Sequence, residues 1–220
     1  ETATHQPKYY YFAWANRLIT YYLKTSRTNI ALYEVQNMLK EAQEEDDKTG
    51  LSRCYNIMSQ IYTIKRFDSM AFEWRLKEIE LTEKYKIENY NISQTYAQIA
   101  NYYINQKKQK EALAAVEKAI ATANSSTQQI SAKLEFVNYY SKFGDFQAAE
   151  KLLKECQAAF EQDKRLESIK KRLYNIECLY YQQTKQYPKA LEAAKMQEKE
   201  ERRLSESILS SIHYRTQGEI

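Results

Sequence analysis

The chain of 220 residues contains only 3 Gly and 2 Pro. Because these two residue types punctuate sheets, hairpins and long loops, their scarcity predicts helices joined by tight turns. The 33 basic and 29 acidic residues give a net charge of +4 and are mixed along the sequence, which argues against nucleic-acid binding, since that function needs a coherent basic stripe.

The sequence offers little chemistry for catalysis or for metal binding. Its two histidines, His5 and His213, lie near opposite ends of the chain, and no glycine-rich phosphate-binding motif occurs. Cys54, Cys156 and Cys178 have no C-x-x-C spacing and lie among apolar residues of predicted helices, where a thiol packs as a small hydrophobe. We therefore predict no enzymatic activity, no cofactor and no metal site.

The sequence has no run of about 18 apolar residues, so we expect any membrane association to come only from segments outside this chain. It begins at Glu1 without an initiator Met or a hydrophobic signal core, and it ends at Ile220 in a charged helical segment. These ends are typical of a piece of a longer protein. Reduced cysteines are compatible with either a periplasmic or a cytoplasmic location.

Internal repetition is clearest from Leu134 to Cys156, where two helical apolar patterns flank a predicted turn at Gly144-Asp145-Phe146. A copy from Tyr96 to Ala119 has the same offsets, with Lys107-Lys108-Gln109 at the turn, and a third copy runs from Tyr174 to Ala194. Two weaker copies precede them. The pattern predicts five helical hairpins, over residues 8–45, 49–85, 90–123, 126–162 and 165–200.

One small residue in the second helix of each hairpin should let the first helix approach closely. The aligned positions are Ala31, Met70, Ala112, Ala149 and Ala190, separated by 39, 42, 37 and 41 residues. Met70 is the one large residue among them.

Three sequence signals mark helix starts. Ser126 and Gln129 have the spacing of a capping box, Asp145 precedes a helical pattern, and Pro188 falls in a predicted first turn.

The segments Tyr96 to Ala119 and Phe136 to Cys156 resemble the tetratricopeptide repeat family, and the resemblance extends over roughly residues 13–200. It implies an all-α, right-handed solenoid of about five hairpins, forming a single repeat domain over residues 1–220. The chain departs from the family in its repeat spacing, which exceeds the usual ~34 residues. It also departs at Met70 and lacks the family's Trp and most of its Gly and Pro.

Nothing breaks the helical pattern between Pro188 and Gly218, which predicts an extended last helix over residues 188–216. The six charged residues from Glu198 to Arg203 should stay out of the core, whereas Leu204, Ile208 and Ile212 recur on one stripe. This stripe either caps the last hairpin or serves as a dimer or output face. We favour pairing with a second copy of the chain.

The segment from Arg203 to Ile208 resembles the stretch that follows the repeats in membrane-anchored sensor kinases and helix-turn-helix regulators of Bacteroidetes-type bacteria. That resemblance implies the sensor region of a bacterial signal-transduction protein, which faces the periplasm as part of an inner-membrane protein. The alternative is a free-standing intracellular scaffold or adaptor in the cytoplasm.

In the tetratricopeptide repeat family, the first helix of each hairpin lines a groove that binds a protein or peptide. Projected onto this sequence, the groove positions are Asn16, Tyr55, Tyr62, Gln94, Asn101, Asn138, Arg172, Asn175 and Gln182. Amide side chains both donate and accept, so they can hold the backbone of an extended peptide without reading its sequence. The alternative is that these are solvated polar positions. We expect the side chains of Asn101 and Asn138 to be exposed.

Overall fold

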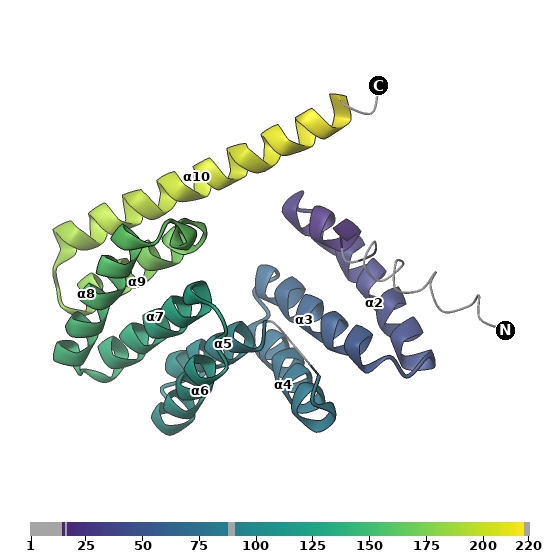
Figure 1. Ribbon diagram of the computed structural model, residues 1–220, viewed down its shortest axis with the longest axis horizontal. Helices are drawn as coiled ribbons and strands as arrows, with labels where there is room; N and C mark the ends of the chain where they lie inside the picture. Colours follow the sequence, from purple (N-terminus) through teal and green to yellow (C-terminus); the bar gives the residue numbers. More distant parts are fainter. Residues whose placement is uncertain (1–14, 16, 88–90, 218–220) are drawn as a thin grey trace. The chain divides into compact units, whose positions relative to one another are not determined.

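The computed structural model describes residues 15, 17–87 and 91–217, with side chains up to Glu206. All regular structure within these ranges is helical (Figure 1), which confirms the predicted all-α fold class. Residues 17–24 are helical and precede the first labelled helix. The labelled elements are α2 (Thr28–Glu44), α3 (Lys48–Ile64), α4 (Asp68–Tyr85), α5 (Ile92–Asn105), α6 (Gln109–Ala121), α7 (Ser126–Phe143), α8 (Phe146–Gln162), the 3-10 helix η1 (Lys164–Ile169), α9 (Lys170–Gln183) and α10 (Tyr187–Gln217).

The chain divides into two compact units, Glu1–Thr95 and Tyr96–Ile220. In the first unit, α3 packs against both α2 and α4. In the second unit, α7 packs against α6, α8 and α9, and α9 packs against α10. The helices pair as hairpins, as predicted, while a single domain over residues 1–220 stays a prediction. Among the described residues, no helix reaches the length and hydropathy that a membrane crossing requires.

The turns inside the hairpins share one backbone geometry. In each turn one residue adopts the left-handed conformation, with φ between 58° and 90°: Ser26, Arg66, Lys107, Gly144 and Lys185. The N–H of the next residue then donates to a tyrosine carbonyl five residues earlier, over 2.8 to 2.9 Å, in the pairs Arg27–Tyr22, Phe67–Tyr62, Lys108–Tyr103, Asp145–Tyr140 and Gln186–Tyr181. This is the Schellman arrangement, which satisfies carbonyl groups at the end of the first helix.

A buried alanine lies five residues after each left-handed turn residue. These alanines are Ala31, Ala71, Ala112, Ala149 and Ala190, all at most 4% exposed. The prediction that Met70 occupies the small position was wrong, because Met70 points to solvent and its neighbour Ala71 is fully buried. The second hairpin therefore does not depart from the others at this position.

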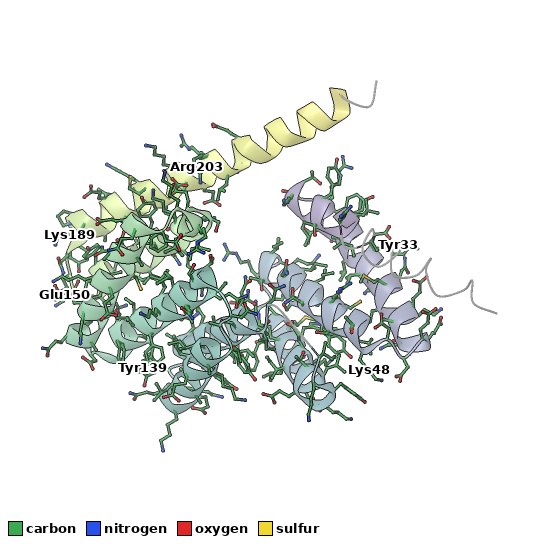
Figure 2. All side chains as sticks on the ribbon, viewed as in Figure 1. Tyr33, Lys48, Tyr139, Glu150, Lys189 and Arg203 are labelled. Atoms are coloured by element: carbon green, nitrogen blue, oxygen red, sulfur yellow. The ribbon has the colours of Figure 1, made fainter. Side chains whose placement is uncertain are left out.

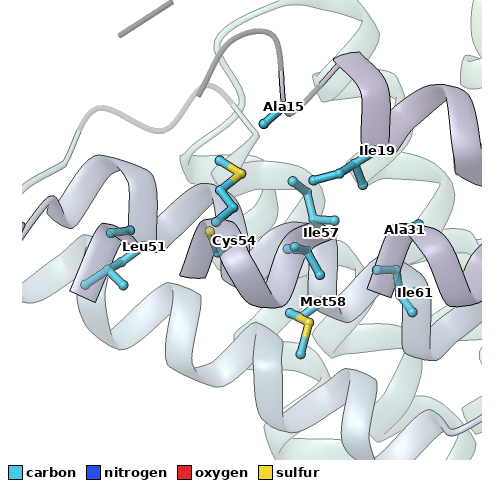
Figure 3. Close-up of a cluster of buried hydrophobic side chains, with 11 residues drawn as sticks. Ala15, Ile19, Ala31, Leu51, Cys54, Ile57, Met58 and Ile61 are labelled. Atoms are coloured by element: carbon cyan, nitrogen blue, oxygen red, sulfur yellow. The ribbon is translucent and has the colours of Figure 1, made fainter. Parts of the chain in front are cut away.

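Two apolar clusters show how these positions are used. Around Ala31, the first unit buries residues from the N-terminal helical segment, α2 and α3 (Figure 3). Around Ala149, the second unit buries residues from α7, α8, η1 and α9. Cys54 and Cys156 belong to these clusters, and burial raises the pKa of their thiols to about 12 and about 11. Both cysteines therefore act as small hydrophobes, as predicted.

The predicted helix starts are confirmed at two places and displaced at one. Asp145 caps α8 by accepting from the Ala148 N–H at 3.0 Å, and Pro188 is the second residue of α10. The cap of α7 is Ser125 rather than Ser126, since the Ser125 hydroxyl accepts from the Gln128 N–H.

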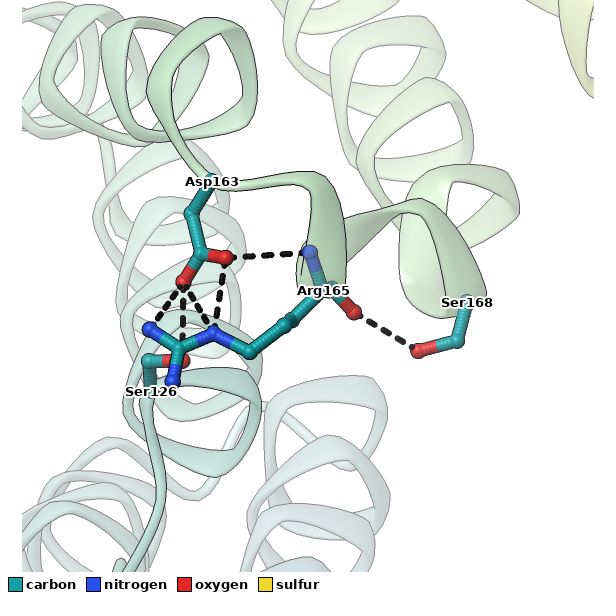
Figure 4. A network of polar contacts seen from close by, with 4 residues as sticks. All are labelled: Ser126, Asp163, Arg165 and Ser168. Atoms are coloured by element: carbon teal, nitrogen blue, oxygen red, sulfur yellow. Dashed lines mark hydrogen bonds and ion pairs between the residues drawn. The ribbon is translucent and has the colours of Figure 1, made fainter.

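The hydroxyl of Ser126 instead donates to Asp163 Oδ2 over 3.1 Å, which ties the start of α7 to the start of η1 (Figure 4). The side chain and the backbone N–H of Arg165 also donate to the Asp163 carboxylate. These bonds lower the pKa of Asp163 to about 2. The carboxylate therefore stays ionised and links two successive hairpins of the second unit.

Replacing Ala112 with Leu should lower the free energy of unfolding by about 1–3 kcal/mol, because the larger side chain overpacks the hairpin. Urea denaturation measures the change. Ala114→Leu is the matched control, since Ala114 is exposed on the same helix and its substitution should shift stability by about 0.5 kcal/mol or less. Equal effects of the two substitutions would contradict the alanine register.

Candidate functional site

The predicted groove residues lie on the first helices of the hairpins. Tyr55 and Tyr62 lie on α3, Gln94 and Asn101 on α5, Asn138 on α7, and Arg172, Asn175 and Gln182 on α9, while Asn16 lies outside the described residues. Gln94, Asn175 and Gln182 are exposed, and Asn101 is half-buried. The expectation that Asn138 is exposed was wrong, because its side chain is only 9% exposed.

The two tyrosines of α3 contribute to packing within their hairpin. The ring of Tyr55 lies 5.4 Å from that of Trp74 on α4, and the ring of Tyr62 lies 6.4 Å from that of Phe67 at the turn. The Tyr62 carbonyl also accepts the turn hydrogen bond from the Phe67 N–H at 2.9 Å. Both rings therefore pack partly within their own hairpin.

The alanine register identifies two amide positions that recur among the hairpins. Asn56 and Asn175 lie fifteen residues before the buried alanine of their own hairpin, and Gln60, Asn101 and Asn138 lie eleven residues before it. These positions differ by four residues, about one helical turn, so the amides occupy one face of the first helix. We call this the first-helix face. Asn56 and Gln60 were not among the predicted groove residues, because Met70 rather than Ala71 was taken as the small position of the second hairpin.

On α9 the same face carries three of the predicted residues. Arg172, Asn175 and Gln182 follow one another at spacings of three and seven residues, which places them on one stripe of the helix. The core of the second unit takes the neighbouring stripe of α9, which contains Leu173, Ile176 and Tyr180. The stripe with Arg172, Asn175 and Gln182 is therefore not part of this apolar core.

A buried carboxylate orients the amides of the first unit. Glu78 on α4 is 1% exposed, and the Asn56 Nδ2 group donates to both of its carboxylate oxygens at 3.2 Å. Thr95 Oγ1 donates to Glu78 Oε2 at 3.1 Å, and Gln60 Nε2 donates to Asn56 Oδ1 at 2.6 Å. Because both oxygens of Glu78 accept from the Asn56 Nδ2 group, they fix which way the amide of Asn56 points.

A second buried carboxylate joins two first helices in the second unit. Glu135 on α7 is 3% exposed and accepts from Arg172 Nη2 on α9 at 2.6 Å. Asn138 Nδ2 donates to the other oxygen of Glu135 at 3.4 Å. Arg172 Nε is buried and has no hydrogen-bond partner among the described residues. Arg172 and Asn138 thus form one polar cluster with Glu135, which was not predicted.

This arrangement is suited to hydrogen bonding. Asn175 and Gln182 are exposed amides on the stripe of α9 that also carries Arg172, whose guanidinium is held by Glu135, and an amide offers both a donor and an acceptor to a peptide backbone. Among the described residues, no three His, Cys, Asp or Glu side chains come close enough to hold a metal ion.

The predicted output residues Leu204, Ile208 and Ile212 all fall within α10. Leu204 is half-buried, whereas the side chains of Ile208 and Ile212 lie outside the described residues. The expectation that the charged run from Glu198 to Arg203 stays out of the core was wrong for Glu200, which is 8% exposed. Arg203 Nε donates to Glu200 Oε2 at 2.8 Å, and this ion pair offsets part of the cost of burying the carboxylate.

No protein-family model matches this sequence, and no curated protein matches it. The fold matches solved structures of tetratricopeptide-like repeat proteins. A Rap protein complexed with Competence and Sporulation Factor superposes with a TM-score of 0.64 at 16% identity, over 86% of this chain and 53% of that chain. BtubC (BKLC) from P. vanneervenii gives a TM-score of 0.61 at 15% identity, over 85% of this chain and 78% of that chain.

A Podosopora anserina putative kinesin light chain with nearly identical TPR-like repeats gives a TM-score of 0.59 at 14% identity, over 87% of this chain and 95% of that chain. At such identities the likeness concerns the fold. The tetratricopeptide-like hairpin fold implied by the sequence is therefore confirmed at the level of structure.

Replacing Arg172 with Met should lower the free energy of unfolding by about 3 kcal/mol, because the Glu135 carboxylate would stay buried without its cation. Lys171→Met is the matched control: it removes the exposed ion pair between Lys171 and Glu201 and should cost less than about 1 kcal/mol. Adding Glu135→Gln to Arg172→Met should recover part of the loss. Equal costs in urea denaturation for the two single variants would show that the buried pair does not support the cluster.

Proposed function

We propose that this chain is a binding domain that holds an extended peptide or a partner protein on the first-helix face of the second unit and catalyses no reaction. One observation carries the proposal. The buried Glu135 carboxylate holds the half-buried Arg172 guanidinium on the stripe of α9 that carries the exposed amides of Asn175 and Gln182. Groups fixed before binding lose less conformational entropy when a ligand arrives.

The chemistry of this face favours a peptide over nucleic acid. The cluster contains one cation, Arg172, and that cation is already paired with Glu135, so the face offers no row of free charges to a phosphate backbone. Asn175 and Gln182 can instead bond peptide N–H and C=O groups. A Rap protein of similar fold is seen with Competence and Sporulation Factor, which supports the proposal that this fold can hold a partner.

We propose further that the domain is the sensor region of a bacterial signal-transduction protein in the periplasm and that α10 transmits its state. The support is the length of α10, which has 31 residues against 13 to 18 for the other labelled α-helices. A second copy of the chain is the proposed partner of the distal part of α10. A concentration-dependent dimer in sedimentation supports this pairing, and a monomer at every concentration would leave α10 as a terminal cap.

The competing function is that of a free-standing cytoplasmic scaffold or adaptor. The coding sequence on both sides of this chain separates the two proposals. A signal peptide before Glu1 and an apolar segment of about 20 residues after Ile220 would support the sensor. Their absence from the complete protein would favour the scaffold.

Replacing Asn175 and Gln182 together with Ala should weaken peptide binding by about tenfold or more, since both amides are exposed on the first-helix face. The probe is a displayed library of random peptides of roughly ten residues, screened against the full chain. Enriched sequences are then made as free peptides and measured by calorimetry.

The matched control is Gln109→Ala with Gln147→Ala, which removes two exposed amides from the second helices α6 and α8. The control should leave the affinity unchanged. A library without enriched sequences, or equal losses in the two double variants, would refute binding on the first-helix face.

A further inference from the structure

A second surface lies at the hairpin turns of the first unit. We define the turn-end patch as residues 24–30 and 64–70, which contain the turns centred on Ser26 and Arg66. Lys65 Nζ donates to Asn29 Oδ1 at 2.7 Å and ties the two turns together. Between them lies a shallow pocket of about 390 Å³, lined by residues 26–30, 64 and 65. The two turns thus form one continuous surface.

Large apolar side chains of the turn-end patch face solvent. Ile64 and Phe67 are 51% and 52% exposed, and Ile30 and Met70 are also exposed. Tyr33 lies three residues beyond Ile30, on the same side of α2, and is likewise exposed (Figure 2). Exposed apolar residues gathered in this way are typical of surfaces that bind another molecule.

The charge of the patch specifies the partner further. It contains the basic residues Lys24, Arg27, Lys65 and Arg66 against the single acidic residue Asp68. The other end of α2 has the opposite balance, since residues 40–48 include five acidic and two basic side chains. The basic character therefore belongs to the turn end of these helices and is not a general feature of the first unit.

We propose that the turn-end patch binds an acidic peptide segment of another protein, with one aliphatic or aromatic side chain anchored between Ile30 and Ile64. Carboxylates on both sides of the anchor would face Arg27 and Arg66. An uncharged apolar partner would desolvate these cations without pairing them, and a phosphate polymer would leave the apolar residues unused. The site shares no residue with the first-helix face, so it does not depend on the function proposed above.

Peptide arrays test the proposal directly with the full chain. One array presents peptides of roughly ten residues in which a single Ile or Phe stands among Asp and Glu, and the matched array has Asn and Gln in place of the acids. The chain should bind the acidic array and not the amide array, and binding should fall about tenfold or more between roughly 0.05 and 0.5 M salt.

Arg27→Glu combined with Arg66→Glu should lower binding to the acidic array by about tenfold or more, and Ile64→Ser should lower it independently. The control is Lys151→Glu combined with Lys195→Glu, which makes the same change in net charge at exposed positions of the second unit and should keep the binding. Thermal melts monitored by circular dichroism confirm that each variant is folded.

Equal binding to the two arrays, or an equal loss in the control variant, would overturn the proposal. It would also be overturned if the patch variants abolished self-association of the chain while leaving peptide binding intact, because the occupant would then be a second copy. Variants at Asn175 and Gln182 should not affect array binding, so failure here is distinguishable from failure of the function proposed for the first-helix face.

Discussion

Close contact between two helices across an alanine methyl group is the interaction on which each hairpin depends. The alanine lies five residues after a left-handed turn residue, so the turn fixes which position of the second helix meets the first helix. Gly144 adopts the left-handed conformation without strain because it has no side chain, whereas Arg66 and Lys107 adopt it at a cost of about 1–2 kcal/mol each. The close helix packing that follows the turn must offset this conformational cost.

Five of the 20 tyrosines recur at one position of this hairpin. A tyrosine stands nine residues before each buried alanine, and its carbonyl accepts the hydrogen bond that closes the turn. In the second unit its ring contacts a preceding tyrosine, at 5.5 Å for Tyr139 and Tyr140 and at 5.4 Å for Tyr180 and Tyr181. A half-buried ring with a polar tip suits this place. Because the tyrosines and the buried alanines make the contacts within each hairpin, the first-helix face can carry polar groups.

The sequence located four of the five small positions. Ala149 follows a turn marked by Gly144, whereas Ala31, Ala112 and Ala190 were assigned correctly although their turns have no glycine. In the second hairpin two adjacent residues fit the apolar pattern, and Met70 was chosen over Ala71. The amides of the second unit could be predicted because they recur along the chain, whereas Asn56 and Gln60 of the first unit were missed. Their carboxylate partners could not, since Glu135 meets Arg172 from 37 residues away and Glu78 meets Asn56 from 22 residues away. Such pairs depend on how the helices pack.

Amide hydrogen exchange at the five turn positions tests the repeated hairpin most directly. The N–H groups of Arg27, Phe67, Lys108, Asp145 and Gln186 all donate to tyrosine carbonyls. They should exchange about 100-fold more slowly than the same residues in unstructured peptides, because each must wait for its hairpin to open. Exchange at the unstructured rate in these positions, in a chain that is otherwise helical, would contradict a common turn and with it the alanine register.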